Sequence, residues 1–518
     1  MVAISWRSSR GVIIGWVLGV VAVFAATAAS INSLYGTRVQ LKTYAEATSS
    51  GSALYAINGR PFGLNTIGGP ITYEFGFVAA IAVPLMAIIL MIAMTRREEQ
   101  TGRMELLRSG AVGRTAALAS AMVLTTTAFL VMAAGMLVVL AALGLSWPGV
   151  MLYPLSLALL GIAFTAAGAL CAQLLASARG ATALGLGILV IAFVVRGVGD
   201  VRDNALVWLS PLGWAEQTRA FGHARWWPLL LLATTAILAS VAALRLADRR
   251  DLGEGMLARR RGRSRAGRVL LHSFGFSARR HRAAIVGWSV VSALVGAGFG
   301  SVGDAYGTVT RGNPALQKFV GGGSTSANAF VSLVVILIVL ICMGFAISGI
   351  NAVSEEEGSS RLEPLLAGSV SRPRLLAGHA VALIAGVVAV ATAGGLALGV
   401  SNAITTANPS QVWRLIAATF AYLPAVALVM GLAAALYGLR PDALWIAWLP
   451  FVFITVVAVL GDTLQLPHWV KDISPMSWVG RVPLESASPV AMVGALLTAL
   501  ALAAVTLRAF QGRDVPSH

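Results

Sequence analysis

The sequence predicts an all-α polytopic membrane protein with about 12 transmembrane helices in two parallel pseudo-repeats of six. Three observations predict this class. Of the 518 residues, 57% are hydrophobic and only 11% are charged, which is less than half the charge of an average soluble protein. Long apolar runs recur along the chain, and several motifs occur twice. The apolar content excludes a disordered chain, and the presence of only two cysteines excludes a disulfide scaffold.

Apolar runs long enough to cross a bilayer, about 20 residues each, define the predicted helices. The first run could be read as a cleaved signal peptide, but it is long for one and a matching segment recurs in mid-chain. We predict spans at 11–31, 76–94, 116–144, 151–175, 180–198, 228–245, 283–303, 329–350, 376–402, 415–437, 442–460 and 488–507.

These spans divide the chain into three parts. Residues 1–245 form a first six-helix half, 246–282 an Arg-rich cytoplasmic linker and elbow segment, and 283–518 a second six-helix half. With both termini in the cytoplasm, 26 of the 38 Lys and Arg residues fall on the cytoplasmic side, as the positive-inside rule requires. The net charge of +17 is therefore explained by topology, and we expect a multi-pass protein of the plasma membrane.

The densest basic run, Arg259–Arg268, lies in the linker and has three interpretations. It is a stop-transfer and orientation signal, or it also contacts anionic lipid headgroups. Nucleic-acid binding is the weakest interpretation, because no aromatic residues interleave the arginines. We therefore expect membrane lipids, and no nucleic acid, as partners.

Three motifs recur and define the repeat. Arg10-x-x-Ile-x-Gly-Trp16 matches the segment Arg282–Trp288, at an offset of 272 residues. The segment 98–114 aligns without gaps with 356–372 at an offset of 258, and Ser210-Pro-x-x-Trp214 matches Ser474-Pro-x-x-Trp478 at 264. Because the offset changes only across loops, a duplicated six-helix unit explains all three.

The segments 98–114 and 356–372 follow the second span of each half on the predicted cytoplasmic side. Glu99 precedes Arg103 by four residues, as Glu357 precedes Arg361, a spacing that favours a short helix. A solvated loop with orienting charges is the simplest interpretation of one copy. Two copies without gaps favour a pair of short amphipathic helices that a cytoplasmic partner contacts.

Two outer segments, 199–227 and 461–487, precede the last span of each half. Their tryptophans suit aromatic-belt anchoring at the membrane surface. Alternatively, a re-entrant or surface-lying helix pair closes the outer end of a pathway, with Pro211, Trp214, Pro475 and Trp478 as candidate gate residues.

The sequence carries none of the usual catalytic or energy-coupling motifs. None of the lysines, Lys42, Lys318 and Lys471, follows a glycine, so the chain carries no P-loop. The histidines show no metal-ligand spacing, and we expect no metal site; His379 is expected at headgroup level or as a helix cap. All acidic residues fall in loops or at helix ends, and Arg196 lies near an outer boundary, so the sequence predicts no buried proton relay and no enzyme.

The sequence resembles the ABC-2 type permeases of ATP-binding-cassette exporters, and within them the duplicated polyketide-antibiotic, tetronasin-exporter-like form of actinobacteria. That family carries a coupling helix between its second and third helices. In the first half the resemblance is carried by Glu98, Glu99, Gly102, Arg103, Glu105, Leu106, Leu107, Gly110, Val112 and Arg114. In the second half it is carried by Glu356, Glu357, Arg361, Glu363, Leu365, Gly368, Val370 and Arg372. Ser360 in place of Gly102, and Pro364, depart from the pattern.

The resemblance implies an ABC-2 type exporter permease fold and a permease that moves amphipathic drugs, antibiotics or lipid-like compounds out of a bacterial cell. It implies two copies of a separate ATPase subunit that bind ATP and Mg, and no cofactor in this chain. By family analogy, the second and fifth helices of each half line a central cavity. The candidate lining residues are Phe75, Phe77, Met86, Phe451 and Phe453.

Two other classes of function remain open. A proton-driven drug efflux carrier of the major facilitator type also has six plus six helices and a basic linker. A membrane scaffold or enzyme subunit without transport activity is the third class. The repeated acidic segments and the scarcity of charge in the spans favour the exporter permease.

Overall fold

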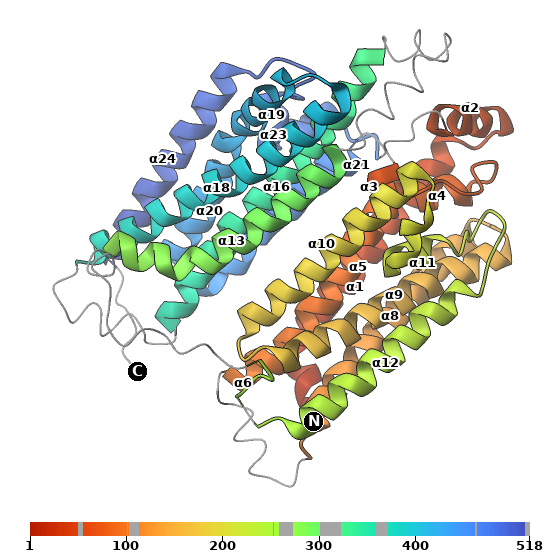
Figure 1. Cartoon of the computed structure of the whole chain (residues 1–518), viewed down its shortest axis with the longest axis horizontal. Coiled ribbons are helices and arrows are strands. Elements are labelled where there is room, and N and C mark those ends of the chain that lie inside the picture. Colours follow the sequence, from red (N-terminus) through yellow and green to blue (C-terminus); the bar gives the residue numbers. More distant parts are fainter. Residues whose placement is uncertain are drawn as a thin grey trace. The chain divides into compact units, whose positions relative to one another are not determined.

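The computed structural model describes residues 1–49, 55–100, 102, 113–251, 253–257, 273–300, 323–358, 371–461 and 464–512. Within these ranges the chain is helical and contains no strand. In the described part of the chain, twelve helices are long and apolar enough to cross a membrane, and each overlaps one of the predicted spans. The prediction of an all-α polytopic membrane protein is therefore confirmed (Figure 1).

The chain divides into two compact units, Met1–Arg261 and Gly262–His518. Unit 1 contains six long helices and several short ones. The long helices are α1 (Val2–Leu34), α5 (Gly76–Ile92), α8 (Ala116–Ala142), α9 (Trp147–Leu174), α10 (Ala178–Arg202) and α12 (Pro228–Arg249). The short ones are α2 (Arg38–Ser49), α3 (Tyr55–Asn58), α4 (Gly68–Glu74), η2 (Ala93–Arg97), α6 (Glu98–Gln100), η3 (Ala205–Leu209) and α11 (Pro211–Glu216).

Unit 2 repeats this order with local differences. Its helices are α13 (Ser273–Gly300), α16 (Gly323–Gly358), α18 (Arg372–Thr406), α19 (Ser410–Ala421), α20 (Leu423–Leu439), η5 (Pro441–Ala447), α21 (Trp448–Leu460), α22 (His468–Lys471), α23 (Pro475–Val479) and α24 (Pro489–Gly512). α13 begins ten residues before the predicted span, inside the segment predicted as linker. The fourth span is split into α19 and α20, and the fifth opens with the 3₁₀ helix η5 instead of a full α-helix like α10.

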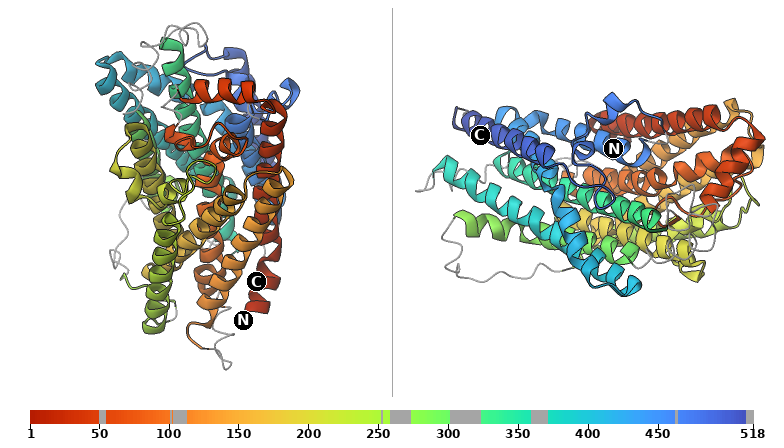
Figure 2. Two further views of the ribbon diagram at one scale, coloured as in Figure 1. Left: turned by 90° about the vertical axis from the view of Figure 1, so that its right-hand side faces the viewer. Right: turned by 90° about the horizontal axis from the view of Figure 1, so that it is seen from above.

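The helices pack in the same pairs in both units. In unit 1, α8 packs against α1 and α9, and α9 also packs against α5 and α12. In unit 2, α18 packs against α13 and α19, and α20 packs against α16 and α24. Since these are the corresponding helices in chain order, the packing repeats along with the motifs. The long helices of each unit run alongside one another in every view (Figure 2).

Burial separates central from peripheral helices. In the most apolar stretch of each helix, 83% of the residues of α16 and 72% of those of α9 are buried. The corresponding shares for α12 and α24 are only 22% and 17%. Many of the exposed side chains of α12 and α24 are nevertheless apolar, including Leu230, Leu238 and Val490. An exposed apolar face suits contact with lipid chains, because the helix satisfies its own backbone polar groups.

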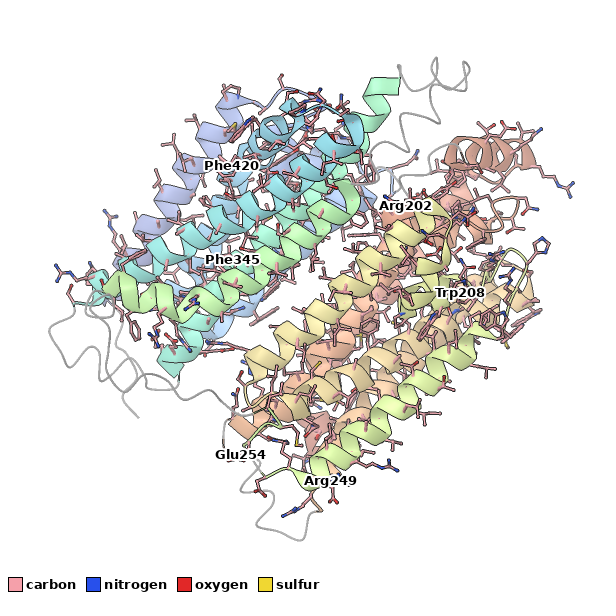
Figure 3. All side chains as sticks on the ribbon, in the orientation of Figure 1. Arg202, Trp208, Arg249, Glu254, Phe345 and Phe420 are labelled. Carbon is pink, nitrogen blue, oxygen red and sulfur yellow. The ribbon has the colours of Figure 1, made fainter. Side chains whose placement is uncertain are left out.

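The two ends of unit 1 carry different elements. The short helices α2, α3, α4 and α11 gather at one end, and the N-terminus and α6 lie at the other (Figure 1). Arg202 and Trp208 lie toward the first of these ends, and Arg249 and Glu254 lie at the second (Figure 3). We call them the outer and the inner end, after their predicted sides of the membrane.

Candidate functional site

The first half of the candidate coupling segment begins as a continuation of the second span. α5 passes through one π-helical stretch, η2, into α6, which carries Glu98 and Glu99. Such π-helical insertions in an α-helix often mark functional sites. The chain then turns at Gly102, whose φ of +75° is unfavourable for a residue with a Cβ atom, which explains the glycine at this point of the motif.

Glu99 is the centre of a cluster of buried charges at the inner end. Its carboxylate accepts a hydrogen bond from Arg96 Nη1 at 2.7 Å, and it accepts bonds from Arg250 Nη2 at 2.6 Å and Nη1 at 3.0 Å. Arg96 also donates to the carbonyl of Ala172, and Arg250 Nε donates to Gln173 Oε1 at 2.9 Å. The carboxylate therefore joins the candidate coupling segment to the last turn of α9 and to the chain after α12.

The far end of the same segment is attached to the same region. Arg114 Nη1 donates a hydrogen bond to the carbonyl of Asp248, in the last turn of α12, at 3.1 Å. Glu99 and Arg114 thus bind residues 248–250 from both sides of segment 98–114. A force on this segment would act directly on the inner ends of α9 and α12.

Unit 2 attaches its copy of the motif with different side chains. Glu356 forms an ion pair with Arg280 of α13, and Glu357 accepts a 2.6 Å hydrogen bond from the Tyr437 hydroxyl of α20. Tyr437 follows Gln173 by 264 residues, the offset of the Ser-Pro-x-x-Trp motif. Gln173 on α9 and Tyr437 on α20 therefore occupy matching positions, and both support the second glutamate of the motif. Gln173 binds Arg250, which in turn binds Glu99, whereas Tyr437 binds Glu357 directly.

Replacing Tyr437 with Phe should destabilise unit 2 measurably. The variant leaves buried Glu357 without the Tyr437 donor, and a hydrogen bond to a charged group contributes about 1.5–3 kcal/mol. Tyr153→Phe is the matched control, because the buried Tyr153 hydroxyl has no hydrogen-bond partner among the described residues. SDS-induced unfolding of the purified protein measures both. Equal stability of Tyr437→Phe and Tyr153→Phe would show that the Glu357 contact is unimportant.

The structure describes only some of the remaining predicted coupling residues. Glu98 is half-buried, and Arg372 begins α18, with its side chain outside the described residues. Six further residues lie outside the described ranges: Arg103, Glu105, Gly110, Arg361, Glu363 and Gly368. The predicted pairs Glu99–Arg103 and Glu357–Arg361 therefore stay predictions, although Glu99 already has two other arginine partners.

The candidate lining residues occupy two kinds of position. Phe75 packs edge-on against Phe24 of α1, with ring centroids 5.0 Å apart, and Phe77 packs against Phe193 of α10 at 6.1 Å. Met86 is also buried. On α21, Phe451 packs edge-on against Trp448, and both Phe451 and Phe453 are half-buried. In unit 1 these side chains thus contribute to packing, and their role in a substrate path stays a prediction.

The Ser-Pro-x-x-Trp motifs form one short helix in each unit. Ser210 precedes α11 and Ser474 precedes α23, with Pro211 and Pro475 as the first helical residues. The Trp214 indole donates to the carbonyl of Trp208, and the Trp478 indole donates to that of Asp472, six residues upstream in both copies. The motif therefore builds the same turn twice. α11 packs against α12, and α23 packs against α24.

A buried charge cluster at the outer end of unit 1 was not predicted. Asp200 does lie at the end of α10 as expected, but it is 3% exposed, and Arg196 one turn earlier is 2% exposed. Arg196 Nη1 donates to Glu216 of α11 at 3.3 Å, and Nε lies 3.6 Å from Asp200 Oδ2. Arg196 Nη2 donates to the carbonyls of Ala56 and Ile57. The position of Asp200 near a helix end agrees with the prediction, but its burial was not predicted.

Gly59 allows the loop after α3 to close over this cluster. Its φ is +92°, and a Cβ atom there would lie 2.6 Å from a Glu216 carboxylate oxygen. The next backbone N–H, that of Arg60, donates to the other Glu216 oxygen at 2.6 Å. Burial raises the pKa of Glu216, although Arg196 and this backbone donor act in the opposite direction.

Two histidines of unit 2 also differ from expectation. His379 of α18 is 2% exposed, and its Nδ1 lies 3.1 Å from Nε2 of His281 on α13. A headgroup-level or capping role for His379 is therefore wrong, because the side chain joins two packed helices. Among the described residues, no group of three or more His, Cys, Asp or Glu side chains is placed to hold a metal ion.

Together these features define a multi-pass membrane protein built from two copies of a six-helix unit, each with an anchored acidic segment at one end. A family model described as "Multidrug efflux system permease Rv1217c, C-terminal domain" matches residues 1–246 and 270–511. The multidrug efflux system permease protein Rv1217c of Mycobacterium tuberculosis (strain ATCC 25618 / H37Rv) is 33% identical over 492 residues, 94% of this chain and 89% of that relative. The chain belongs to this permease family.

Proposed function

We propose that the chain is the transmembrane permease subunit of an ATP-binding-cassette exporter of the ABC-2 type. The anchoring of both acidic segments carries this proposal. In each unit the second glutamate of the motif contacts helices other than its own, through Arg250 in unit 1 and Tyr437 in unit 2. Membership of a multidrug efflux permease family supports export as the direction of transport.

The proposed mechanism transmits motion through these contacts. Two copies of a separate ATPase subunit bind ATP and Mg at the cytoplasmic side, close on ATP and displace the two acidic segments. Because Glu99 and Arg114 join segment 98–114 to the end of α12, displacement of the segment moves α9 and α12 with it. Packed helices respond as rigid elements, so a small shift at one end is transmitted along the span.

The substrate class follows from the composition of the spans. A path between largely uncharged helices suits amphipathic drugs, antibiotics or lipid-like compounds, which bind through apolar surface with few polar contacts. Phe75, Phe77, Met86, Phe451 and Phe453 remain candidate lining residues, and the α11 and α23 turns remain candidates for the outer gate. Both termini lie in the cytoplasm of a bacterial cell in this proposal, and the spans contact membrane lipids.

The coupling role is tested by replacing Glu105 and Glu363 together with alanine. We expect a folded, membrane-inserted protein whose export of a fluorescent amphipathic dye from cells falls at least about tenfold, because removing residues that act together at a coupling site blocks a whole step. The control is Asp472→Asn, because Asp472 lies on the predicted outer side of the membrane, opposite the acidic segments. Undiminished export by the double variant, with the ATPase partner expressed normally, would contradict the assignment.

The buried cluster around Arg196 gives one observation in favour of the second candidate, a proton-driven efflux carrier. Carriers of that kind place ionisable groups within or near the membrane, as Asp200 and Glu216 are placed here. The cluster lies at the outer end of unit 1, and unit 2 has Ala458 and Gly480 at the positions matching Arg196 and Glu216. An acid pair present in one unit only does not supply the symmetric pathway that two such halves would form around a carrier's proton site.

A further inference from the structure

The outer charge cluster contains more acid than base. Asp200 and Glu216 are both paired with the single guanidinium of Arg196, with Oδ2 of Asp200 3.6 Å from Nε and Oε2 of Glu216 3.3 Å from Nη1. The Arg60 side chain forms its ion pair with Asp203, which is largely exposed. If both buried carboxyl groups were ionised, the cluster would hold two negative charges against one positive charge.

The excess negative charge would fall mainly on Asp200. Its side chain is 1% exposed, and neither carboxylate oxygen accepts a hydrogen bond from a donor among the described residues. A buried carboxylate without a donor is strongly unfavourable. Two carboxyl groups held against one guanidinium cannot both ionise at low cost, and one proton shared between them removes the repulsion while giving Asp200 a hydrogen-bond partner.

A cavity that borders Glu216 and Arg196 gives water access to the cluster. About 80 Å³ in volume, it is lined by Glu216 and Arg196, together with Asn58, Tyr153 and Arg219. This is room for a few water molecules. The buried Tyr153 hydroxyl, which has no partner among the described residues, provides a further polar contact for them.

We propose that Asp200 and Glu216 form a binding site for one proton, shared between the two carboxyl groups and reached through this cavity. With the proton bound, the pair and Arg196 are together neutral. The proposal goes beyond the exporter function and does not depend on it. Ala458 and Gly480 at the matching positions of unit 2 restrict the site to the first half.

The shared proton stabilises the closure of the outer end. Arg196 and Glu216 together bind the backbone of Ala56, Ile57 and Arg60, so the cluster holds the loop after α3 against α10 and α11. Loss of the proton places two adjacent anions beneath this loop and weakens the attachment. The other charged groups facing the cluster are Arg60 with Asp203, and Arg219, whose guanidinium lies over the Phe62 ring.

Infrared spectroscopy of the purified full-length chain tests for the proton directly. We expect the carbonyl band of a protonated carboxylic acid at neutral pH, lost at alkaline pH. Asp200→Asn and Glu216→Gln should each abolish the band, because the remaining carboxylate pairs with Arg196 alone. The Asp472→Asn variant, which removes an exposed acid of unit 2, should retain it. Absence of the band in the wild type at neutral pH, or its persistence in both single variants, would overturn the proposal.

Thermal unfolding provides a second readout that does not rely on spectral assignment. Above the ordinary pKa of glutamate, about 4.3, the folded pair keeps a proton that the unfolded chain has released, so stability falls as pH rises. Glu216→Gln should remove this alkaline loss, and Asp472→Asn should not. An alkaline loss that disappears on adding sodium would show that the site takes a metal cation instead, which would also overturn the proposal.

Discussion

Replacing Glu99 with alanine should both destabilise unit 1 and abolish export. The variant leaves Arg96 and Arg250 as neighbouring buried cations, 1% and 5% exposed at their side chains, with no carboxylate between them. Removing one partner of a buried ion pair costs about 3–5 kcal/mol, because the remaining charge is left uncompensated. Segment 98–114 also loses its attachment to α9 and to the chain after α12.

The measurement is the unfolding midpoint of the purified protein together with dye export from cells. Glu254→Gln is the matched control, because the Glu254 side chain is exposed and only its backbone carbonyl accepts a hydrogen bond from Arg250. We expect wild-type stability and export from this control. If Glu99→Ala matched the control in both measurements, the anchoring of the coupling segment would have no functional role.

Replacing Arg196 with glutamine should have an effect of similar size at the outer end. Among the described residues, the variant removes the only guanidinium that contacts Asp200 and Glu216, and it removes donors to the carbonyls of Ala56 and Ile57. The same cost of about 3–5 kcal/mol applies at neutral pH. The exposed Arg202, also on α10, gives the matched control Arg202→Gln, which should remain stable.

The pH dependence separates this effect from a simple loss of packing. Burial already raises the pKa of Glu216, and loss of the Arg196 charge should raise it further. The folded variant then binds protons that the unfolded chain has released, so its free energy of unfolding rises as pH falls toward the ordinary pKa of a carboxyl group. Thermal unfolding from pH 8 to pH 5 should show the deficit shrinking. A deficit that is constant with pH would contradict the electrostatic explanation.

The fold was predictable because membrane spans are defined locally. Each span is a run of apolar residues whose backbone must bond within its own helix, so hydropathy alone locates it. The motifs at Glu98 and Glu356 likewise revealed the repeat and the candidate coupling segments. The exceptions are backbone details, such as the 3₁₀ start of the fifth span at Pro441 and the break at Tyr422.

The partners of the site residues were not predictable, because they come from distant parts of the chain. Glu99 meets Arg250 across 151 positions, and the sequence favoured Arg103 because local spacing is all that it displays. Asp200 at the end of a helix suggests a solvated boundary residue. It is buried because α3, η3 and α11 pack against α10, which the hydropathy of α10 does not encode.

Identifying the energy source of transport tests the central proposal most directly. The measurement is dye uptake into inside-out proteoliposomes that contain the chain with its ATPase partner, or the chain alone. We expect uptake that requires both ATP and the partner, persists when a protonophore collapses the proton gradient, and is absent from the chain alone. Uptake by the chain alone, driven by a pH gradient and abolished by the protonophore, would contradict the proposal.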